Sequence, residues 1–350
     1  MKVVVIGATG NVGTATVRAL MRAPEVTQIV GVARRLPNEP ATAALDGPTV
    51  SWAARDVAVD DLDVLAGADV VVHLAWMIQP QRDEEVLART NIAGTRRVLD
   101  AIVEHRVPSL VYASSVGTYA PAPKHPRADE GWSASGVPSS TYSRHKAAVE
   151  AVLDAFEFDH PEVRVVRMRT SLVFQRTAAS EIHRLFLGRL LPWHLPRPLR
   201  LVPRTSRLQF QATHADDVAD AYVRAVVRPV HGAFNIAAEP VLTPQVIAEA
   251  VEGRTIPVPE AVLRIATGLS FAAHVQPSEA GWIDMATQTP LMDTSRARRE
   301  LGWSERMSAT DALRELIEGI GDGAGTGTPP LHPRHRRPRP HHRHRPSLAA

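Results

Sequence analysis

The 350-residue chain contains no cysteine, only three lysines and no long apolar run. The absence of cysteine excludes disulfide bonds, thiolate metal sites and cysteine nucleophiles. No apolar stretch approaches the roughly 18–20 residues that a membrane-spanning helix needs. The short apolar start is broken at Gly7, so it does not form the core of a signal peptide. These absences favour a soluble, cytoplasmic protein with no membrane partner, in which each lysine is a candidate for a specific role.

Positive charge is concentrated near the end of the chain. The formal net charge is +3, from 40 Lys and Arg against 37 Asp and Glu. Residues 331–350 hold six arginines, five histidines, four prolines and no acid, so the remainder carries 3 − 6 = −3. The basic balance therefore gives no reason to expect the folded body to bind nucleic acid. The composition predicts a flexible linker over 321–330, within a disordered Gly/Pro/Arg/His-rich tail over 321–350.

Short β-branched runs alternate with helix-compatible stretches in the first half of the chain. The expected strands are 2–6, 28–32, 49–53, 69–74, 109–113, 163–168 and 233–236; the expected helices are 14–22, 84–105, 142–158, 216–227, 243–251, 259–271, 294–301 and 309–320. This alternation indicates an α/β fold with a Rossmann-type doubly wound parallel sheet. The pattern predicts a nucleotide-binding domain over 1–170. A smaller substrate lobe mainly over 171–320 is expected to return segments to the sheet.

Three glycines, Gly7, Gly10 and Gly13, lie between the first expected strand and the first expected helix. Glycine at these positions permits a tight turn and close approach of the backbone to a pyrophosphate. The N-terminus of the following helix then presents its amides to the phosphates. In this strand–turn–helix context the motif predicts dinucleotide binding.

The glycine turn, followed downstream by Tyr142-Ser-Arg-His-Lys146, resembles the extended short-chain dehydrogenase/reductase superfamily and its NAD-dependent epimerase/dehydratase-like group. Other matching segments are 73–75, 91–95, 112–115, 214–218, 235–237 and 293–303. The resemblance covers roughly residues 1–320. It implies a nicotinamide cofactor, a small-molecule substrate and a homodimer through helices that include 84–105 and 142–158.

Tyr142 and Lys146 are four residues apart on one expected helix, so both side chains project from the same face. Because a nearby ammonium favours the phenolate, Lys146 is expected to lower the pKa of Tyr142. Tyr142 then serves as a general base toward a hydroxyl or a general acid toward a carbonyl. The resemblance adds that Lys146 holds the nicotinamide ribose and that Ser115 orients the substrate oxygen. It also implies that Asn91 either completes a proton relay or stabilises its helix near the cofactor.

The resemblance also assigns the dinucleotide contacts. They are Gly7, Thr9, Gly10, Asn11, Val12, Gly13, Asp56, Val57, Leu74 and Ala75. NAD-preferring enzymes place an acidic residue at the end of the second strand, where this chain reads Val32-Ala-Arg-Arg35. Arginine suits a 2′-phosphate, so Arg34 favours NADP. The open alternative is that Arg34 stacks on the adenine and NAD is accepted.

Several positions depart from the family pattern and bear on the substrate. Ser115-Val-Gly117 stands where sugar-nucleotide dehydratases carry Thr-Asp-Glu, so the acid and base for that dehydration are missing. The segments 118–120 and 169–176 also lack usual motif residues, which alters the loops expected near the nicotinamide. Two sets of residues keep alternative interpretations. Arginines in 182–208 either grip a phosphate or form a solvated face, and Trp76, Met77 and Trp132 either line an apolar site or only pack.

These residues together predict an NAD(P)-dependent oxidoreductase that moves hydride between nicotinamide and a hydroxyl or carbonyl carbon. One alternative is a sugar-nucleotide epimerase with transient oxidation. The other is a non-enzymatic NAD(P)-binding sensor, against which the Tyr–Lys pair argues. No metal site is predicted, because the resemblance makes Asp216 and Asp217 a helix N-cap and a structural contact.

Overall fold

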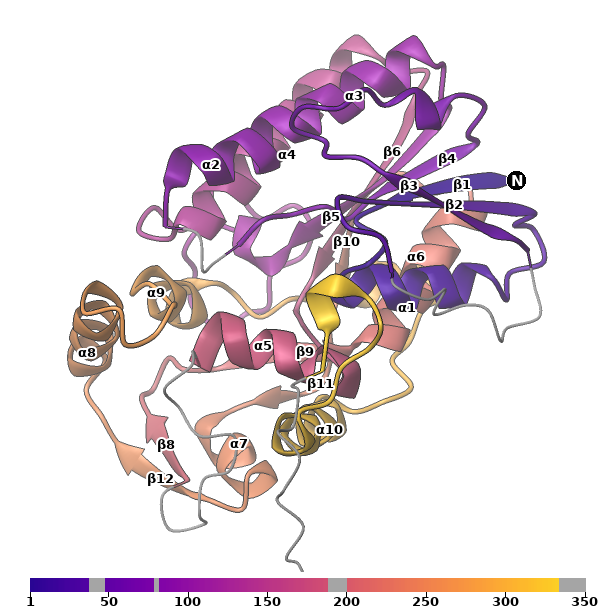
Figure 1. Ribbon diagram of the computed structural model, residues 1–350. Helices are drawn as coiled ribbons and strands as arrows, with labels where there is room; N and C mark the ends of the chain where they lie inside the picture. The colour runs from indigo at the N-terminus through magenta and orange to yellow at the C-terminus, as the bar shows by residue number, and fades with distance from the viewer. Residues whose placement is uncertain (38–47, 79–81, 188–199, 334–350) are drawn as a thin grey trace, which may run out of the picture.

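The computed structural model describes residues 1–37, 48–78, 82–187 and 200–333, and its centre is a seven-stranded parallel sheet (Figure 1). The strands are β1 (Lys2–Ile6), β2 (Gln28–Ala33), β3 (Val50–Ala54), β4 (Val70–His73), β5 (Ser109–Ser115), β6 (Arg164–Thr170) and β10 (Gly232–Ile236). Their order is β10-β6-β5-β4-β1-β2-β3. The chain order reverses beside β1, and such a reversal opens a ligand crevice at the carboxyl ends of the strands. The predicted Rossmann-type sheet is confirmed.

Helices cover both faces of this sheet (Figure 1). They are α1 (Asn11–Leu20) and α6 (Ala215–Val227) on one face, and α3 (Gly94–Glu104) and α4 (Thr141–Asp159) on the other. Side chains of β1 alternate between the two layers. Val3 and Val5 pack toward α1 and α6, whereas Val4 and Ile6 pack toward α3 and α4. All four side chains are buried, as a parallel strand covered on both faces requires.

The predicted helix over 84–105 is helical from 84 to 104 but not regular. It consists of α2 (Glu84–Ala88), a π-helical turn (Arg89–Ala93) and α3. A π-helical turn inside a helix often marks a functional position, because it shifts the register of the side chains that follow. Here the turn carries Asn91.

The remaining elements form a smaller lobe below the sheet in Figure 1. It contains a sheet of β7 (Leu172–Phe174), β9 (Phe210–His214) and β11 (Ala238–Leu242), a pair of β8 (Leu201–Arg204) and β12 (Arg254–Pro257), and the helices α5 (Ala179–Ile182), α7 (Pro244–Ala250), α8 (Glu260–Ala272), α9 (Gly281–Gln288) and α10 (Ala309–Asp322). The sequence pattern did not predict α5, α9 or the short strands of the lobe. Within the described residues, no helix combines the length and apolarity needed to cross a bilayer.

The stretch 321–330, for which the composition predicts a flexible linker, is instead packed. Helix α10 ends at Gly323, whose φ of +62° suits glycine, and the chain then folds back against α5. The Ser180 amide donates to the Ala324 carbonyl over 3.1 Å. Leu331 is fully buried at the end of a 3-10 turn. One apolar anchor therefore orders a Gly/Pro-rich segment, while the rest of the predicted tail, 334–350, lies outside the described residues.

Replacing Leu331 with alanine is expected to lower the free energy of unfolding by about 2–5 kcal/mol, because it empties a fully buried leucine site. Urea denaturation measures the loss. The matched control is Val59→Ala, where the side chain is 69% exposed and a change below about 0.5 kcal/mol is expected. Equal stability of the Leu331→Ala protein and the wild type would show that this turn is not part of the folded body.

Candidate active site

The turn between β1 and α1 joins the predicted glycines to the ends of two neighbouring strands. Gly7 has a φ of +88°, and a Cβ on it would lie 2.6 Å from the Ala75 amide nitrogen. A Cβ on Gly13 would overlap the Gly7 carbonyl group. The Gly7 amide donates to the Val32 carbonyl over 2.8 Å. This packing requires glycine at both positions and leaves the backbone bare where a ligand would approach.

The N-terminus of α1 fits a pyrophosphate. Its N-cap is Gly10, no side chain caps the helix, and its first turn carries no acidic residue. The unpaired amides and the positive end of the helix dipole therefore favour an anion. The side-chain amide of Asn11 is held in place by the chain after β6. Its nitrogen donates to the Val173 carbonyl over 2.9 Å, and its oxygen accepts from the Gln175 side chain over 2.7 Å. Three other predicted contact residues, Thr9, Val12 and Leu74, lie within or directly beside this turn.

Arg34, Asp56 and Val57 follow the carboxyl ends of β2 and β3, which are neighbours in the sheet. Arg34 is exposed, whereas Val57 is buried. The Asp56 carboxylate accepts the Ala58 amide over 3.0 Å, which fixes the loop after β3. The structure thus brings these three residues to the same edge of the sheet as the glycine turn.

Tyr142 and Ser115 meet at the carboxyl end of β5. Ser115 ends that strand and accepts the Gly117 amide over 3.0 Å, and its hydroxyl lies near enough to Tyr142 to lower the pKa of the phenol. A Cβ on Gly117 would lie 2.8 Å from the Tyr142 ring, so this glycine makes room for the phenol. Burial raises the pKa of Tyr142 to about 12, and the nearby Ser115 hydroxyl opposes this shift. The expectation that Lys146 lowers the pKa of Tyr142 is wrong, because burial outweighs any effect of the ammonium.

Lys146 is buried beneath Tyr142 and bonded to the backbone. Its ammonium donates to the Ala113 carbonyl over 2.6 Å and lies 3.5 Å from the centre of the Trp76 ring. Its distance to the centre of the Tyr142 ring is 5.9 Å. Burial lowers the pKa of Lys146 to about 7, while the nearby Glu150 raises it. The charge of this lysine therefore changes near neutral pH.

Asn91 holds the backbone at the exit from β4. Its side-chain oxygen accepts the Met77 amide over 2.7 Å, and its side-chain nitrogen donates to the Met77 carbonyl over 2.8 Å. Met77 therefore occupies both the oxygen and the nitrogen of the Asn91 side chain, which is 1% exposed. This geometry ties the π-helical turn to the chain after β4, and both roles of Asn91 stay predictions.

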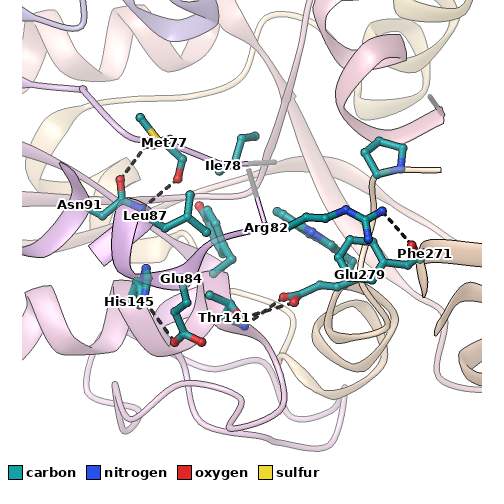
Figure 2. Close-up of a pocket in the computed structure, with 13 residues that line it drawn as sticks. Met77, Ile78, Arg82, Glu84, Leu87, Asn91, Thr141, His145, Phe271 and Glu279 are labelled. Carbon is teal, nitrogen blue, oxygen red and sulfur yellow. Dashed lines mark hydrogen bonds and ion pairs between the residues drawn. The ribbon is translucent and has the colours of Figure 1, made fainter. Parts of the chain in front are cut away.

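A pocket of about 330 Å³ opens beside Tyr142 (Figure 2). Its lining residues come from 77–91, from the start of α4 and from the segment 271–282: Met77, Ile78, Arg82, Glu84, Leu87, Asn91, Thr141, Tyr142, His145, Phe271, Pro277, Glu279 and Trp282. Sequence reasoning missed most of them. His145 had a signal, since it follows Tyr142 by three residues and so shares its helix face.

Trp76, Met77 and Trp132, the candidates for an apolar substrate site, occupy different surroundings in the structure. Met77 lines the pocket, and Trp76 meets the Tyr142 ring edge-on with the ring centres 6.0 Å apart. Trp132 is 38% exposed and does not line the pocket. Two arginines of the basic stretch are bonded to the backbone away from the pocket: Arg184 donates to Pro330 and Arg200 to Val251.

Asp216 and Asp217 lie at the start of α6. The N-cap is His214, whose ring nitrogen accepts the Asp216 amide, so the predicted N-cap role of an aspartate is corrected. Asp217 is 3% exposed and accepts the backbone amides of Arg306 and Met307. Its role is a structural contact between α6 and the chain before α10.

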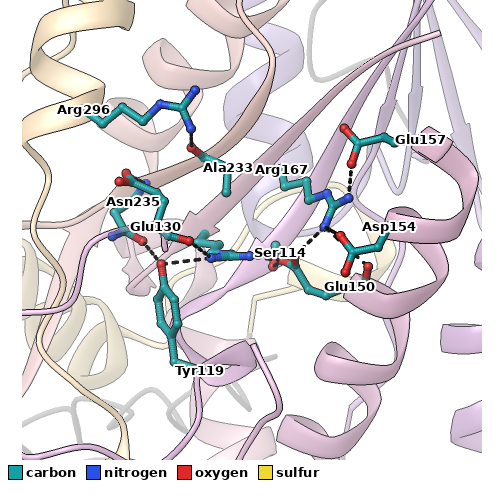
Figure 3. Close-up of polar contacts among 11 residues, drawn as sticks. Ser114, Tyr119, Glu130, Glu150, Asp154, Glu157, Arg167, Ala233, Asn235 and Arg296 are labelled. Atoms are coloured by element: carbon teal, nitrogen blue, oxygen red, sulfur yellow. Dashed lines mark hydrogen bonds and ion pairs between the residues drawn. The ribbon is translucent and has the colours of Figure 1, made fainter. Parts of the chain in front are cut away.

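A buried ion-pair cluster surrounds Glu150 (Figure 3). Glu150 follows Lys146 by one turn of α4. The Glu150 carboxylate accepts from Arg169 over 2.8 Å, from Arg167 over 3.0 Å and from the Ser114 hydroxyl. Glu150 is 1% exposed, and each arginine is 5% exposed. Although burial alone raises the pKa of this carboxyl, Arg169, Ser114 and Arg167 hold it below its ordinary value. The cluster joins β5, β6 and α4 behind Ser115 and Lys146.

Comparison with known proteins agrees with this fold. The family model for the NAD dependent epimerase/dehydratase family matches residues 3–237. An uncharacterized protein of Mycobacterium tuberculosis is 25% identical over 262 residues, covering 72% of this chain and 66% of that protein. A decarboxylating sterol-4-alpha-carboxylate 3-dehydrogenase of Candida albicans is 29% identical over 181 residues, 49% of this chain and 50% of its own.

A solved structure of UDP-glucuronic acid 4-epimerase from Bacillus cereus in complex with NAD is 18% identical. It covers 91% of this chain and 98% of its own, with a TM-score of 0.66, and shows the same fold. The chain spans no more than two thirds of the length of these curated relatives. The family match, by contrast, extends from the first strand to the end of β10. The chain belongs to the NAD-dependent epimerase/dehydratase family, a family of enzymes of the extended short-chain dehydrogenase/reductase type.

Proposed function

We propose that this protein is an NAD(P)-dependent oxidoreductase in which Tyr142 transfers a proton to or from the substrate oxygen. The observation that carries the proposal is the position of Tyr142, which lines a pocket, lies beside Ser115 and precedes Lys146 by one helical turn. The bound nicotinamide would supply or accept the hydride. Lys146 would hold its ribose, and the turn from Gly7 to Gly13 would hold its pyrophosphate.

Tyr142 and Ser115 would have different roles toward the substrate oxygen. The pKa of Tyr142 is about 12, so the phenol holds its proton at neutral pH and donates it to a carbonyl oxygen during reduction. Ser115 bonds the same substrate oxygen and orients it. During oxidation the phenol must first release its proton to solvent, and the neighbouring Ser115 hydroxyl favours this release by lowering the pKa of the phenol.

Measurement of NAD(P)H at 340 nm tests the reaction class. A net oxidoreductase changes one cofactor molecule for each substrate molecule converted, whereas an epimerase returns the hydride and leaves the cofactor unchanged. A protein that binds cofactor but converts no substrate would support the sensor alternative. The sugar-nucleotide and sterol names among the related proteins make both substrate types reasonable first candidates.

For the cofactor we propose NADP, because Arg34 is an exposed cation after β2 and no acid stands beside it until Glu39. Arg34→Ala is expected to weaken NADP binding about tenfold or more and to leave NAD binding within about twofold, since only NADP carries the 2′-phosphate. Calorimetric titration of both cofactors measures this. Arg22→Ala, an exposed arginine after the end of α1, is the control. Equal or tighter binding of NAD by the wild type would overturn the preference.

A further inference from the structure

The polar side chains that line the pocket are already bonded within its wall. Glu279 accepts from the Thr141 amide over 3.0 Å and from the Thr141 hydroxyl over 3.3 Å, which ties α9's leading loop to α4 (Figure 2). Arg82 donates to the Phe271 carbonyl over 2.7 Å, and its guanidinium stacks over the ring of the same residue at 3.9 Å. These contacts join segments far apart in the chain and close one side of the pocket.

The other side of the pocket is closed in the same way. Glu84 pairs with Arg144 over 2.7 Å and with the ring of His145 over 3.5 Å. The oxygen and the nitrogen of the Asn91 side chain are both hydrogen-bonded to the Met77 backbone. Among the described lining residues, the Tyr142 hydroxyl is therefore the group best placed to bond a substrate oxygen, with Ser115 behind it.

The surface around that hydroxyl is apolar and aromatic. The Trp282 ring packs against Tyr142 with centres 5.1 Å apart, and Phe186 packs edge-on against Trp282 at 5.0 Å. The apolar wall consists of Met77, Ile78, Leu87, Phe271, Pro277 and Trp282. Such a set of side chains binds hydrocarbon by burial.

The charges at the pocket disfavour an anion. Two carboxylates, Glu84 and Glu279, line it, while its lining cation Arg82 is held against Phe271. Because Glu84 is paired with Arg144 over 2.7 Å, the repulsion that a pyrophosphate would meet comes mainly from Glu279. The volume of about 330 Å³ is also near the lower end of the range for ligand pockets. A single ring system fits this size better than a nucleotide joined to a sugar.

Resting on the proposed function, we propose that the substrate is an uncharged alcohol or ketone on an apolar ring system. Its ring would lie against Trp282 and Phe271, and its oxygen would bond Tyr142. The apolar part of the wall and the Glu279 carboxylate favour this class over an anionic sugar nucleotide.

The test uses the full chain saturated with oxidised cofactor and three probes: cyclohexanol, trans-4-ethylcyclohexanol and UDP-glucose. Both kcat/KM at 340 nm and Kd by calorimetry are measured. Each buried methylene contributes about fourfold, so the ethyl compound should exceed cyclohexanol about fifteenfold in kcat/KM and in affinity. In Trp282→Ala this ratio should fall below about threefold, because the wall that buries the ethyl group is lost. Trp132→Ala, which removes an exposed tryptophan outside the pocket, should keep it.

The outcomes separate the two proposals. Turnover of UDP-glucose that depends on Tyr142, or tighter binding of UDP-glucose than of the ethyl compound, would overturn the substrate class and leave the proposed reaction standing. Failure of both alcohols to bind at millimolar concentration would also overturn it. Failure of the chain to bind either nicotinamide cofactor would overturn the proposed reaction itself, and the substrate class with it.

Discussion

Tyr142→Phe is expected to lower kcat by about 10²–10⁴-fold, because the substitution removes the phenol that exchanges a proton with the substrate oxygen. The phenylalanine ring keeps the packing against Trp76 and Trp282, so the fold and cofactor binding should be unchanged. KM should change little, since the lost interaction strengthens mainly in the transition state. Steady-state kinetics at 340 nm with the best substrate, together with cofactor titration, measure these quantities.

The matched control is Tyr222→Phe, which removes the hydroxyl of a buried tyrosine on α6 that does not line the pocket. Activity within about twofold of wild type is expected for this variant. Should Tyr142→Phe retain more than half of the wild-type kcat, the proton must be carried by another group. His145 would then be the first candidate, because it lines the same pocket.

The pKa of Tyr142 shows where local sequence reasoning ends. The spacing of Tyr142 and Lys146 correctly places both on one helix, but it carries no information on burial. In the structure, the Lys146 ammonium is turned toward the Ala113 carbonyl and the Trp76 ring, and burial decides the pKa of the phenol. A motif therefore predicts which groups meet, and the surroundings that the fold adds decide their protonation.

The parts of the fold that the sequence predicts best are those with a local physical cause. β-branched runs mark the buried strands, and glycine marks the turn after β1, where a Cβ on Gly7 has no room. The pocket wall has no such local cause. Glu279 binds Thr141 across 138 positions in the chain, and Trp282 reaches Tyr142 from a helix with no strong sequence signal. Only the tertiary fold brings these residues to the site.

The segment 321–333 illustrates the opposite error. Glycine and proline increase the freedom of the unfolded chain, so their abundance predicts flexibility. One buried apolar side chain, Leu331, together with a backbone bond between Ser180 of α5 and Ala324 overcomes that tendency. Composition averages over residues, whereas a single apolar anchor in a preformed site is sufficient to order a loop.

The buried cluster at Glu150 gives the largest expected effect on stability. Glu150→Gln is expected to lower the free energy of unfolding by about 3–5 kcal/mol, because Arg169 then lacks its carboxylate partner in a buried site. Urea denaturation at neutral pH measures the loss. The matched control is Asp154→Asn, which removes another partner of Arg167. Its side chain is 72% exposed, so a loss below about 1 kcal/mol is expected.

Glu150→Gln should also change how the free energy of unfolding depends on pH. Glu150 raises the pKa of Lys146, which burial lowers from 10.5 to about 7, so removal of its charge lowers that pKa further. At a pH between the pKa of Lys146 in the folded protein and its pKa in the unfolded chain, the unfolded chain binds more protons. In that pH range Lys146 therefore makes the free energy of unfolding rise with pH. In Glu150→Gln the rise should begin at a lower pH than in the wild type, whereas Asp154→Asn should leave it near pH 7. An unchanged onset in Glu150→Gln would show that Glu150 stabilises the arginines alone and does not influence the charge of Lys146.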